Sequence, residues 1–176
     1  MKTLDELQRL WHEHADPPAG RGVLRRICVR KANEVKLATA TAELTRADGV
    51  VGDHWTADED PNRHSQITLM NATVGDLIAH GDTPPHTSGD NFHVDLDLSE
   101  TALPIGARLR LGTAVLEVTP EPHTGCKTFA ARFGKDALRW MHLEENRHLR
   151  LRGVHCLVVE DGVAKIGDEV VVLDMD

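Results

Sequence analysis

The sequence predicts an α+β protein, mostly β with a few helices, whose strands form a mixed or closed, barrel-like sheet. Short segments enriched in β-branched residues recur along the chain and are separated by turn-forming pairs such as Asp48-Gly49 and Asp161-Gly162. Helical patterns occur at the amino terminus and after residue 126, so helices are inserted into an otherwise β-rich order. A length of 176 residues suits one ordinary domain that can bury a core.

The amino terminus is expected to form a short amphipathic helix. Thr3-Leu4-Asp5-Glu6 has the pattern of a capping box, in which the first and last side chains each bind the other's backbone amide. Apolar side chains follow at helical spacing, and Pro17-Pro18 would end the helix. We therefore expect a helical extension over residues 1–19 and a single domain over residues 20–176.

The remainder of the chain alternates strand and turn signals. Strands, roughly eight of them, are expected over residues 23–31, 36–45, 66–70, 92–98, 108–111, 114–119, 153–159 and 169–173. Gly112 stands where a tight hairpin turn is needed, Asn71 can cap a helix that follows it, and residues 83–89 form a Pro-rich loop. After Cys126, apolar residues at helical intervals are interrupted by Gly134 and predict two short helices.

The composition of the chain indicates which classes of binding partner and which cellular compartment to expect. A formal charge of −8 disfavours nucleic acid and anionic membranes, and an aromatic content of 3% without Tyr disfavours base stacking. The amino terminus has no apolar signal-peptide core, and no apolar run approaches the roughly 20 residues of a membrane span. Cys28, Cys126 and Cys156 are an odd, widely spaced set, which favours free thiols in a reducing cytoplasm over a disulfide framework.

The most informative segment leads to one cysteine and runs Pro120-Glu121-Pro122-His123-Thr124-Gly125-Cys126-Lys127. Two prolines stiffen it, and Gly125 permits a backbone conformation that a side chain would forbid. Cys126 falls at the start of a predicted helix, where the helix terminus, His123 and Lys127 would stabilise a thiolate. Cys126 and His123 are therefore candidate catalytic residues, and the thiolate could act as nucleophile, persulfide carrier or soft-metal ligand.

The alternative for any single cysteine is a small, buried, hydrophobic side chain. This alternative is preferred for Cys28 and Cys156, which lie in apolar strand patterns, whereas polar, turn-forming residues flank Cys126. Eleven histidines invite a metal hypothesis, but no pair has the spacing that marks a zinc site. A histidine site would have to be assembled from distant residues, which the sequence does not specify.

Cationic side chains suggest an anionic ligand beside Cys126, because guanidinium groups bind phosphate in a bidentate way. The cations near this cysteine in sequence, together with one from an early loop, are Lys127, Arg132, Arg147, Arg150, Arg152 and Arg63. For Arg147 and Arg150, ion pairs with neighbouring glutamates on a solvated helix face are the preferred explanation.

Several short segments of the sequence follow one another in an order that is specific as a whole, although each segment alone is a weak signal. They are Gly49-Val50-Val51-Gly52-Asp53-His54, Arg63-His64-Ser65-Gln66-Ile67-Thr68-Leu69, Gly89-Asp90-Asn91-Phe92, residues 103–112, residues 118–127, Arg152-Gly153-Val154 and residues 162–172. Over residues 20–174 this order resembles the MOSC family, named for the C-terminal domain of molybdenum cofactor sulfurase.

The resemblance implies a β-barrel-like fold, the molybdenum cofactor as small-molecule ligand, and a cysteine that carries sulfur or coordinates molybdenum. Cys126 is the implied persulfide carrier or metal ligand. Asn91 and the Gly52-Asp53 turn would shape the pterin pocket. The cations expected to hold the cofactor's phosphate are Arg63, Lys127 and Arg132.

The sequence departs from the reductase-type members that it resembles. Asp90 stands where they usually have Glu, and Arg63-His64-Ser65-Gln66 replaces a His-Gly-Gly-rich stretch. The sequence has no appended β-barrel domain and no ferredoxin motif. Three functions stay open: a cofactor-binding or sulfur-carrying domain, a molybdenum-dependent reductase of N-hydroxylated small molecules, and a non-catalytic small-molecule-binding module. A cysteine desulfurase or a redox protein would be the partner, and pyridoxal phosphate would act only on that partner.

Overall fold

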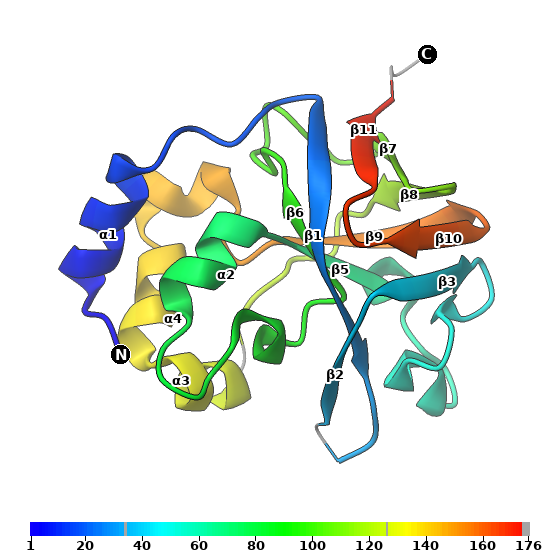
Figure 1. The fold of residues 1–176 in the computed structure, drawn as a ribbon, viewed down its shortest axis with the longest axis horizontal. Coiled ribbons are helices and arrows are strands. Elements are labelled where there is room, and N and C mark those ends of the chain that lie inside the picture. The colour runs from blue at the N-terminus through cyan, green and yellow to red at the C-terminus, as the bar shows by residue number, and fades with distance from the viewer. Residues whose placement is uncertain (34, 126, 174–176) are drawn as a thin grey trace.

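The computed structural model describes residues 1–33, 35–125 and 127–173. The helices are α1 (Leu4–Glu13), α2 (Ala72–Ile78), α3 (Lys127–Phe133) and α4 (Lys135–Met141), with 3-10 turns η1 (His54–Ala57), η2 (Arg63–Ser65), η3 (Pro85–Ser88) and η4 (Glu144–Leu149). The strands are β1 (Arg21–Arg30), β2 (Lys36–Thr39), β3 (Thr41–Thr45), β4 (Gly49–Val50), β5 (Ile67–Asn71), β6 (Phe92–Asp95), β7 (Arg108–Leu111), β8 (Ala114–Val118), β9 (Val154–Glu160), β10 (Gly162–Lys165) and β11 (Glu169–Val172). Figure 1 shows the helices gathered on one side of the strands.

The main sheet closes on itself. Its strands follow the order β11-β7-β8-β9-β5-β6-β1, and the long strand β1 also pairs with β11, which completes a ring of seven. β5 and β6 run parallel, whereas the other neighbouring pairs of the ring run antiparallel. β2 pairs with β1 and projects beyond the ring, and β10, β3 and β4 form a small second sheet (Figure 1). The predicted mixed, barrel-like sheet is confirmed.

The alternation of side chains along the strands builds the barrel core. In β7, Leu109 and Leu111 are fully buried, while Arg108 and Arg110 between them are exposed. This period of two places one face of the strand inside the barrel and the other in solvent. The same interior receives apolar side chains from all seven ring strands, so a continuous core supports the barrel wall.

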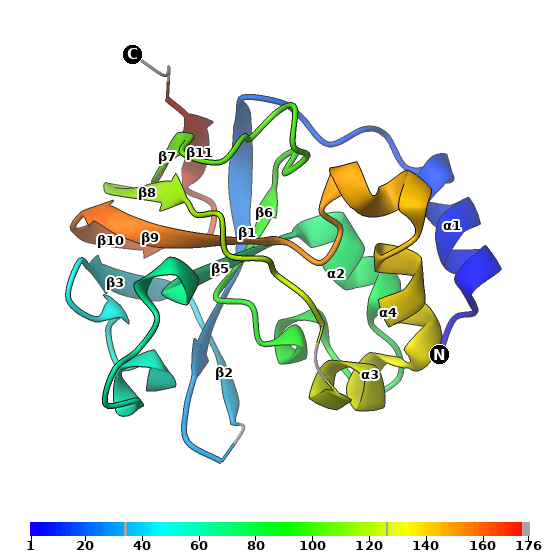
Figure 2. The same ribbon diagram turned by 180° about the vertical axis from the view of Figure 1, so that it is seen from behind.

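A second apolar cluster lies under the helices. The predicted capping box is present, because Thr3 accepts from the Glu6 amide and the Glu6 carboxylate accepts from the Thr3 amide at 2.7 Å. α1 packs on α2 and α4 (Figure 2), where Trp11 meets the edge of Trp140 with ring centroids 6.2 Å apart. Gln8 accepts a 2.8 Å hydrogen bond from the Trp140 indole, which satisfies the polar atom of a buried ring. No helix of the described ranges is long and apolar enough to cross a membrane.

The structure corrects the expected strand boundaries. The strand predicted over residues 36–45 breaks at Ala40, so that β2 pairs with β1 and β3 pairs with β10 in the second sheet. The Ala40 carbonyl accepts from the Ile166 amide, a contact that fixes the break. β4, β10 and η4 were not predicted, the strand predicted over residues 92–98 ends at Asp95, and the Pro-rich loop contains η3. β10 pairs with the sequence-distant β3, which leaves no local signal, and β4 has only two residues.

Gly153 marks a close approach between the chain entering β9 and strand β5. Its φ is +104°, and a Cβ there would lie 2.0 Å from the Leu69 carbonyl oxygen and 3.2 Å from the His123 ring. Both the backbone conformation and the space therefore require glycine.

Gly153→Ala is expected to lower the free energy of unfolding by at least about 2 kcal/mol, because the methyl group adds a clash to the strain of a positive φ. Gly20→Ala is the matched control, since Gly20 has a φ of +75° but open space around it. Urea denaturation of both variants checks this, and an equal loss in the two would contradict the assigned clash.

Candidate functional site

The segment leading to Cys126 is pinned to its surroundings. The Thr119 hydroxyl donates to the His64 carbonyl at 2.5 Å, and the Thr119 amide donates to the His155 carbonyl at 3.0 Å. Asn62 donates to the Glu121 carboxylate at 3.2 Å. Cys126 itself lies outside the described residues, so the site is built from the residues around it in sequence and space.

Gly125 lies close to a side chain of α4, and its backbone conformation does not require glycine. Its φ is not in the left-handed region, so the predicted conformational reason is wrong. A Cβ at this position would instead lie 2.1 Å from Cδ1 of Leu138 in α4. The segment therefore passes directly against the helical layer immediately before Cys126.

A buried ionic cluster lies behind this segment. Asp90 precedes β6 and is fully buried, and the Arg152 Nη1 lies 2.9 and 2.8 Å from its two carboxylate oxygens. His123 Nε2 lies 2.6 Å from Asp90 Oδ1 and 2.9 Å from Arg152 Nη1. Nε2 can donate to the carboxylate or accept from the guanidinium, but not both at once. The Arg152 guanidinium also stacks on Phe129 of α3, 4.6 Å from the ring centroid.

Near neutral pH, Asp90 in this cluster is ionised and His123 is uncharged. Burial opposes ionisation of Asp90, but the nearby Arg152 and His123 outweigh it and hold the pKa of this carboxyl well below its usual range. Burial, followed by the positive charge of Arg152, lowers the pKa of His123 to about 3. A neutral His123 does not supply the positive charge that the sequence suggested.

Asp53 and Asn91 form a second buried network. Asp53 accepts from the Arg30 amide at 2.7 Å and from the Asn91 side-chain amide at 3.0 Å, and pairs with the Arg30 guanidinium at 2.9 Å. The Asn91 carbonyl oxygen accepts from the Thr68 amide and hydroxyl, both at 3.1 Å. Both side chains are engaged inside the protein, so they would shape a ligand pocket by fixing its walls. Their predicted role in cofactor binding stays a prediction.

The three predicted phosphate-holding cations are not brought together. Arg63 is exposed in η2, which contacts the start of the 119–125 segment through its neighbour His64. Lys127 is exposed at the first residue of α3, beyond the end of that segment. Arg132, also in α3, donates to the Thr87 carbonyl of η3 at 2.6 Å. α3 and η3 thus lie side by side at one end of the segment, with η2 at the other end. The phosphate roles of these cations stay predictions.

Lys36 is a further cation near η3, and the sequence analysis did not predict it as a site residue. Lys36 of β2 lies over Gly89, where an added Cβ would be 3.0 Å from its Cε. Cations from β2 and α3 therefore flank the same short turn, η3. Only the pairing of β2 with β1 brings Lys36 here, which no local pattern indicates.

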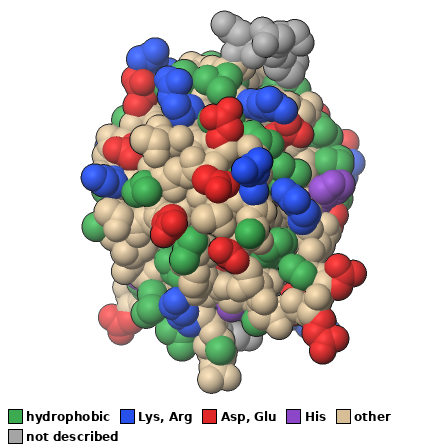
Figure 3. Space-filling view, turned by 90° about the vertical axis from the view of Figure 1, so that its right-hand side faces the viewer, with side chains coloured by type: hydrophobic (Ala, Val, Ile, Leu, Met, Phe, Trp, Pro, Cys, Tyr) green, Lys and Arg blue, Asp and Glu red, His purple; other side chains and the backbone are tan. Residues whose placement is uncertain are grey.

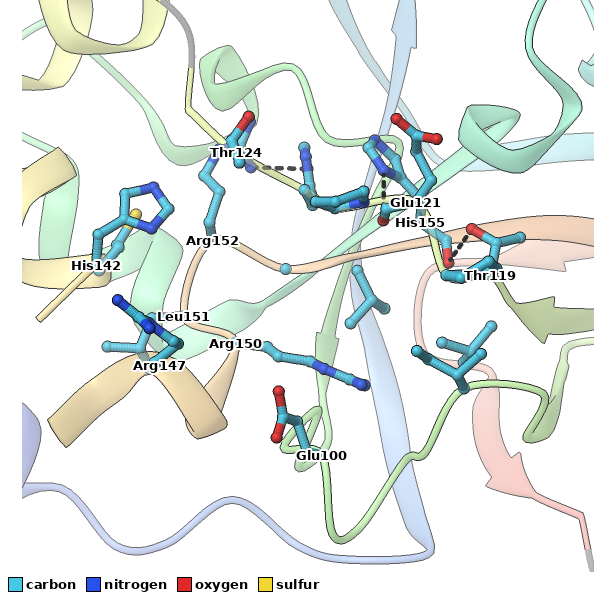
Figure 4. A pocket seen from close by; sticks show the side chains of 18 residues that line it. Glu100, Thr119, Glu121, Thr124, His142, Arg147, Arg150, Leu151, Arg152 and His155 are labelled. Carbon is cyan, nitrogen blue, oxygen red and sulfur yellow. Dashed lines mark hydrogen bonds between the residues drawn. The ribbon is translucent and has the colours of Figure 1, made fainter. Parts of the chain in front are cut away.

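A cavity of about 260 Å³ opens on the 119–125 segment (Figure 4). Its walls are Thr119 to Thr124 on one side and, on the other, residues 150–155 together with His142 and Arg147. Arg147 pairs with Glu144 at 2.9 Å in solvent, as predicted, whereas Arg150 makes a 2.7 Å hydrogen bond to the Leu103 carbonyl. The prediction of a solvated ion pair is therefore wrong for Arg150, because its left-handed backbone, with φ of 51°, ends η4 and redirects the side chain.

The other two cysteines are enclosed in the barrel wall. Cys28 in β1 and Cys156 in β9 are fully buried, which confirms the preferred alternative for both. Burial raises the pKa of Cys28 to about 11 and raises that of Cys156 further.

Within residues 1–33, 35–125 and 127–173, no group of three or more His, Cys, Asp or Glu side chains is placed to hold a metal ion. The face shown in Figure 3 intersperses basic and acidic side chains, without a large patch of one sign.

Comparisons with known proteins show the family and the fold of this chain. The family model described as the MOSC domain matches residues 61–171. The fold is similar to that of the YuaD protein from Bacillus subtilis, with a TM-score of 0.64, 16% identity and coverage of 90% of this chain and 99% of the other. It is also similar to YiiM from Geobacillus stearothermophilus (0.61, 15%, 86% and 75%) and YiiM from Escherichia coli (0.58, 14%, 88% and 71%). No curated protein matches the sequence.

Asp90→Asn is expected to lower the free energy of unfolding by roughly 3–5 kcal/mol, because it leaves the Arg152 charge buried without a counter-charge. Glu144→Gln breaks the exposed pair with Arg147 and should cost at most about 1 kcal/mol. Denaturant titration of both variants at pH 7 is the measurement. Similar losses would show that the buried pair carries no special weight.

The depressed pKa of His123 makes stability depend on pH. The unfolded chain takes up a proton near pH 6.5 that the folded chain refuses until about pH 3, so stability falls as the pH drops through this window. Between pH 7 and 5 the loss should be about 2 kcal/mol larger than in His123→Gln. Denaturation across this range tests the difference, and parallel curves for the two proteins would contradict it.

Proposed function

This chain belongs to the MOSC domain family, and from that premise we propose that it binds the molybdenum cofactor or carries sulfur to it, with Cys126 as the reactive group. The observation that supports this is the fixed approach to Cys126. The preceding segment is pinned at Thr119 and Glu121 and is anchored from behind by the buried Asp90–His123 contact. Such anchoring suits a side chain whose position has to be held for chemistry.

The choice among the three cysteines follows from accessibility and charge. Cys28 and Cys156 are fully buried with raised pKa values, so both stay protonated and out of reach of a sulfur donor. Cys126 adjoins the exposed Lys127 and the first turn of α3, where cationic and backbone donors favour a thiolate.

The surroundings of η3 fit the anionic part of the cofactor. Lys36, Lys127 and Arg132 would hold its phosphate, because cations of β2 and α3 flank this turn in a protein whose net charge is −8. When bound, the cofactor supplies a molybdenum atom that takes sulfur ligands. Asp53 and Asn91 would keep the pocket wall in place through their internal hydrogen bonds.

As a sulfur carrier, Cys126 would react through its thiolate with a persulfide of a donor protein. The thiolate attacks the outer sulfur of the donor, a new S–S bond forms on Cys126, and the donor's S–S bond breaks to release the donor thiolate. No net oxidation occurs, because one persulfide replaces another. A cysteine desulfurase is the class of partner that forms such a donor.

Incubating the native protein with a persulfide donor should add one sulfur atom to Cys126, detected by mass spectrometry of its peptides. The Cys126→Ser variant should take up none, while Cys28→Ser should behave like the wild type. Sulfur on Cys28 or Cys156 instead of Cys126 would overturn the assignment.

Metal and pterin content of the same preparation separates the remaining functions. Stoichiometric molybdenum with oxidisable pterin indicates permanent cofactor binding and favours the reductase of N-hydroxylated compounds. Persulfide formation without stoichiometric metal favours a sulfur carrier. Neither property, with ligand binding unchanged in Cys126→Ser, would leave the non-catalytic binding module and contradict the proposal.

A further inference from the structure

The cavity on the 119–125 segment is lined by a residue set different from the cofactor-holding cations. Thr119 to Thr124 line one side, residues 150–155 line the other, and Glu100 also lines the cavity (Figure 4). The exposed Ile105 is a further lining residue. Lys36, Lys127 and Arg132 are not among its lining residues. A ligand in this cavity would therefore be held by other side chains than those proposed for the cofactor.

Among the described residues, Arg150 is the cation of this cavity that has no carboxylate within ion-pair distance, although Glu100 also lines the cavity. Arg152 is neutralised by Asp90, and Arg147 by Glu144. Arg150 is half-buried, donates to the Leu103 carbonyl, and forms no ion pair within the described ranges. Glu100 acts on it from farther away than ion-pair distance, and burial still lowers the pKa of the guanidinium. A partly buried guanidinium in this state gains from an anion that approaches through the cavity.

The remaining lining defines the rest of the ligand. Burial lowers the pKa values of His142 and His155, so both imidazoles are neutral and can donate or accept a hydrogen bond. The apolar part of the wall is supplied by Ile105, Val118, Pro120, Pro122, Met141 and Leu151. Ile105 is 57% exposed, an apolar side chain left open to solvent. At about 260 Å³ the space suits a small molecule.

We propose that this cavity binds a small organic anion, with a carboxylate or phosphate head on Arg150 and a short apolar body against Ile105 and Pro120. The head replaces the water that would otherwise solvate Arg150, and the body covers the exposed Ile105. The two sources of the head group, carboxylate and phosphate, share this chemistry and differ in charge.

Titration with benzoate, inorganic phosphate and the neutral benzamide tests the proposal. Binding is followed by the side-chain NMR signals of His142 and His155. Benzoate or phosphate should bind saturably, more weakly as ionic strength rises, and benzamide should not. Tighter binding of benzoate identifies a carboxylate ligand with an apolar body, and tighter binding of phosphate identifies a phosphate ligand.

Arg150→Gln should weaken anion binding roughly tenfold or more, the loss of a charged hydrogen bond. Because Arg150 also hydrogen-bonds to the Leu103 carbonyl, a second position that makes no such contact is tested. Ile105→Asp places a negative charge at an exposed lining residue and should abolish binding of both anions, whereas Ile105→Ser removes only the apolar contact and should weaken benzoate binding much less. Arg46→Gln, at an exposed ion pair with Asp161, is the charge-matched control and should bind like the wild type.

Three outcomes would overturn the proposal. The first is the absence of saturable binding of either anion, and the second is wild-type affinity in both Arg150→Gln and Ile105→Asp. The third is loss of binding in Lys127→Gln with retention in Arg150→Gln, which would place the anion at the cations proposed for the cofactor instead. The persulfide assay on Cys126 is independent of these titrations, so failure of one proposal is distinguishable from failure of the other.

Discussion

The buried carboxylate of Asp90 holds together three segments that are far apart in sequence. It follows η3 and precedes β6, binds Arg152 just before β9, and lies 2.6 Å from His123 in the segment that leads to Cys126. Through Arg152 and its stacking on Phe129, it also connects the barrel to the helical layer. The arrangement of the candidate site therefore depends on one charge that is fully removed from solvent.

A buried ion pair is a costly way to join segments, because both charges lose their hydration. An apolar cluster of the same volume would pack the barrel against the helices at least as well. The charges restrict the geometry. Because the Asp90 carboxylate contacts both Arg152 and His123, the 119–125 segment, which contains His123, can occupy few alternative positions. We interpret the cluster as a device that fixes where the chain passes, and the lack of room for a side chain at Gly153 adds to that constraint.

The parts of this structure that the sequence predicts are those with local signals. The capping box at Thr3 and the break at Gly134 each depend on neighbours within a few residues, and both appear as expected. The break at Ala40 depends instead on which distant strand pairs with each half, so the segment looked like one strand. The same holds at the site. Asp90 and Arg152 were both visible in motifs, but only the closure of the barrel shows that they are partners.

The 119–125 segment connects the cavity to the proposed reactive cysteine. It forms a wall of the cavity that contains Arg150, and Cys126 and α3 follow it directly in the sequence. Because the segment is pinned and closely packed, a ligand that contacts its wall cannot move it without straining the Asp90–His123 contact. A ligand in the cavity is therefore expected to leave the segment in place, so that the cavity and Cys126 can be tested separately.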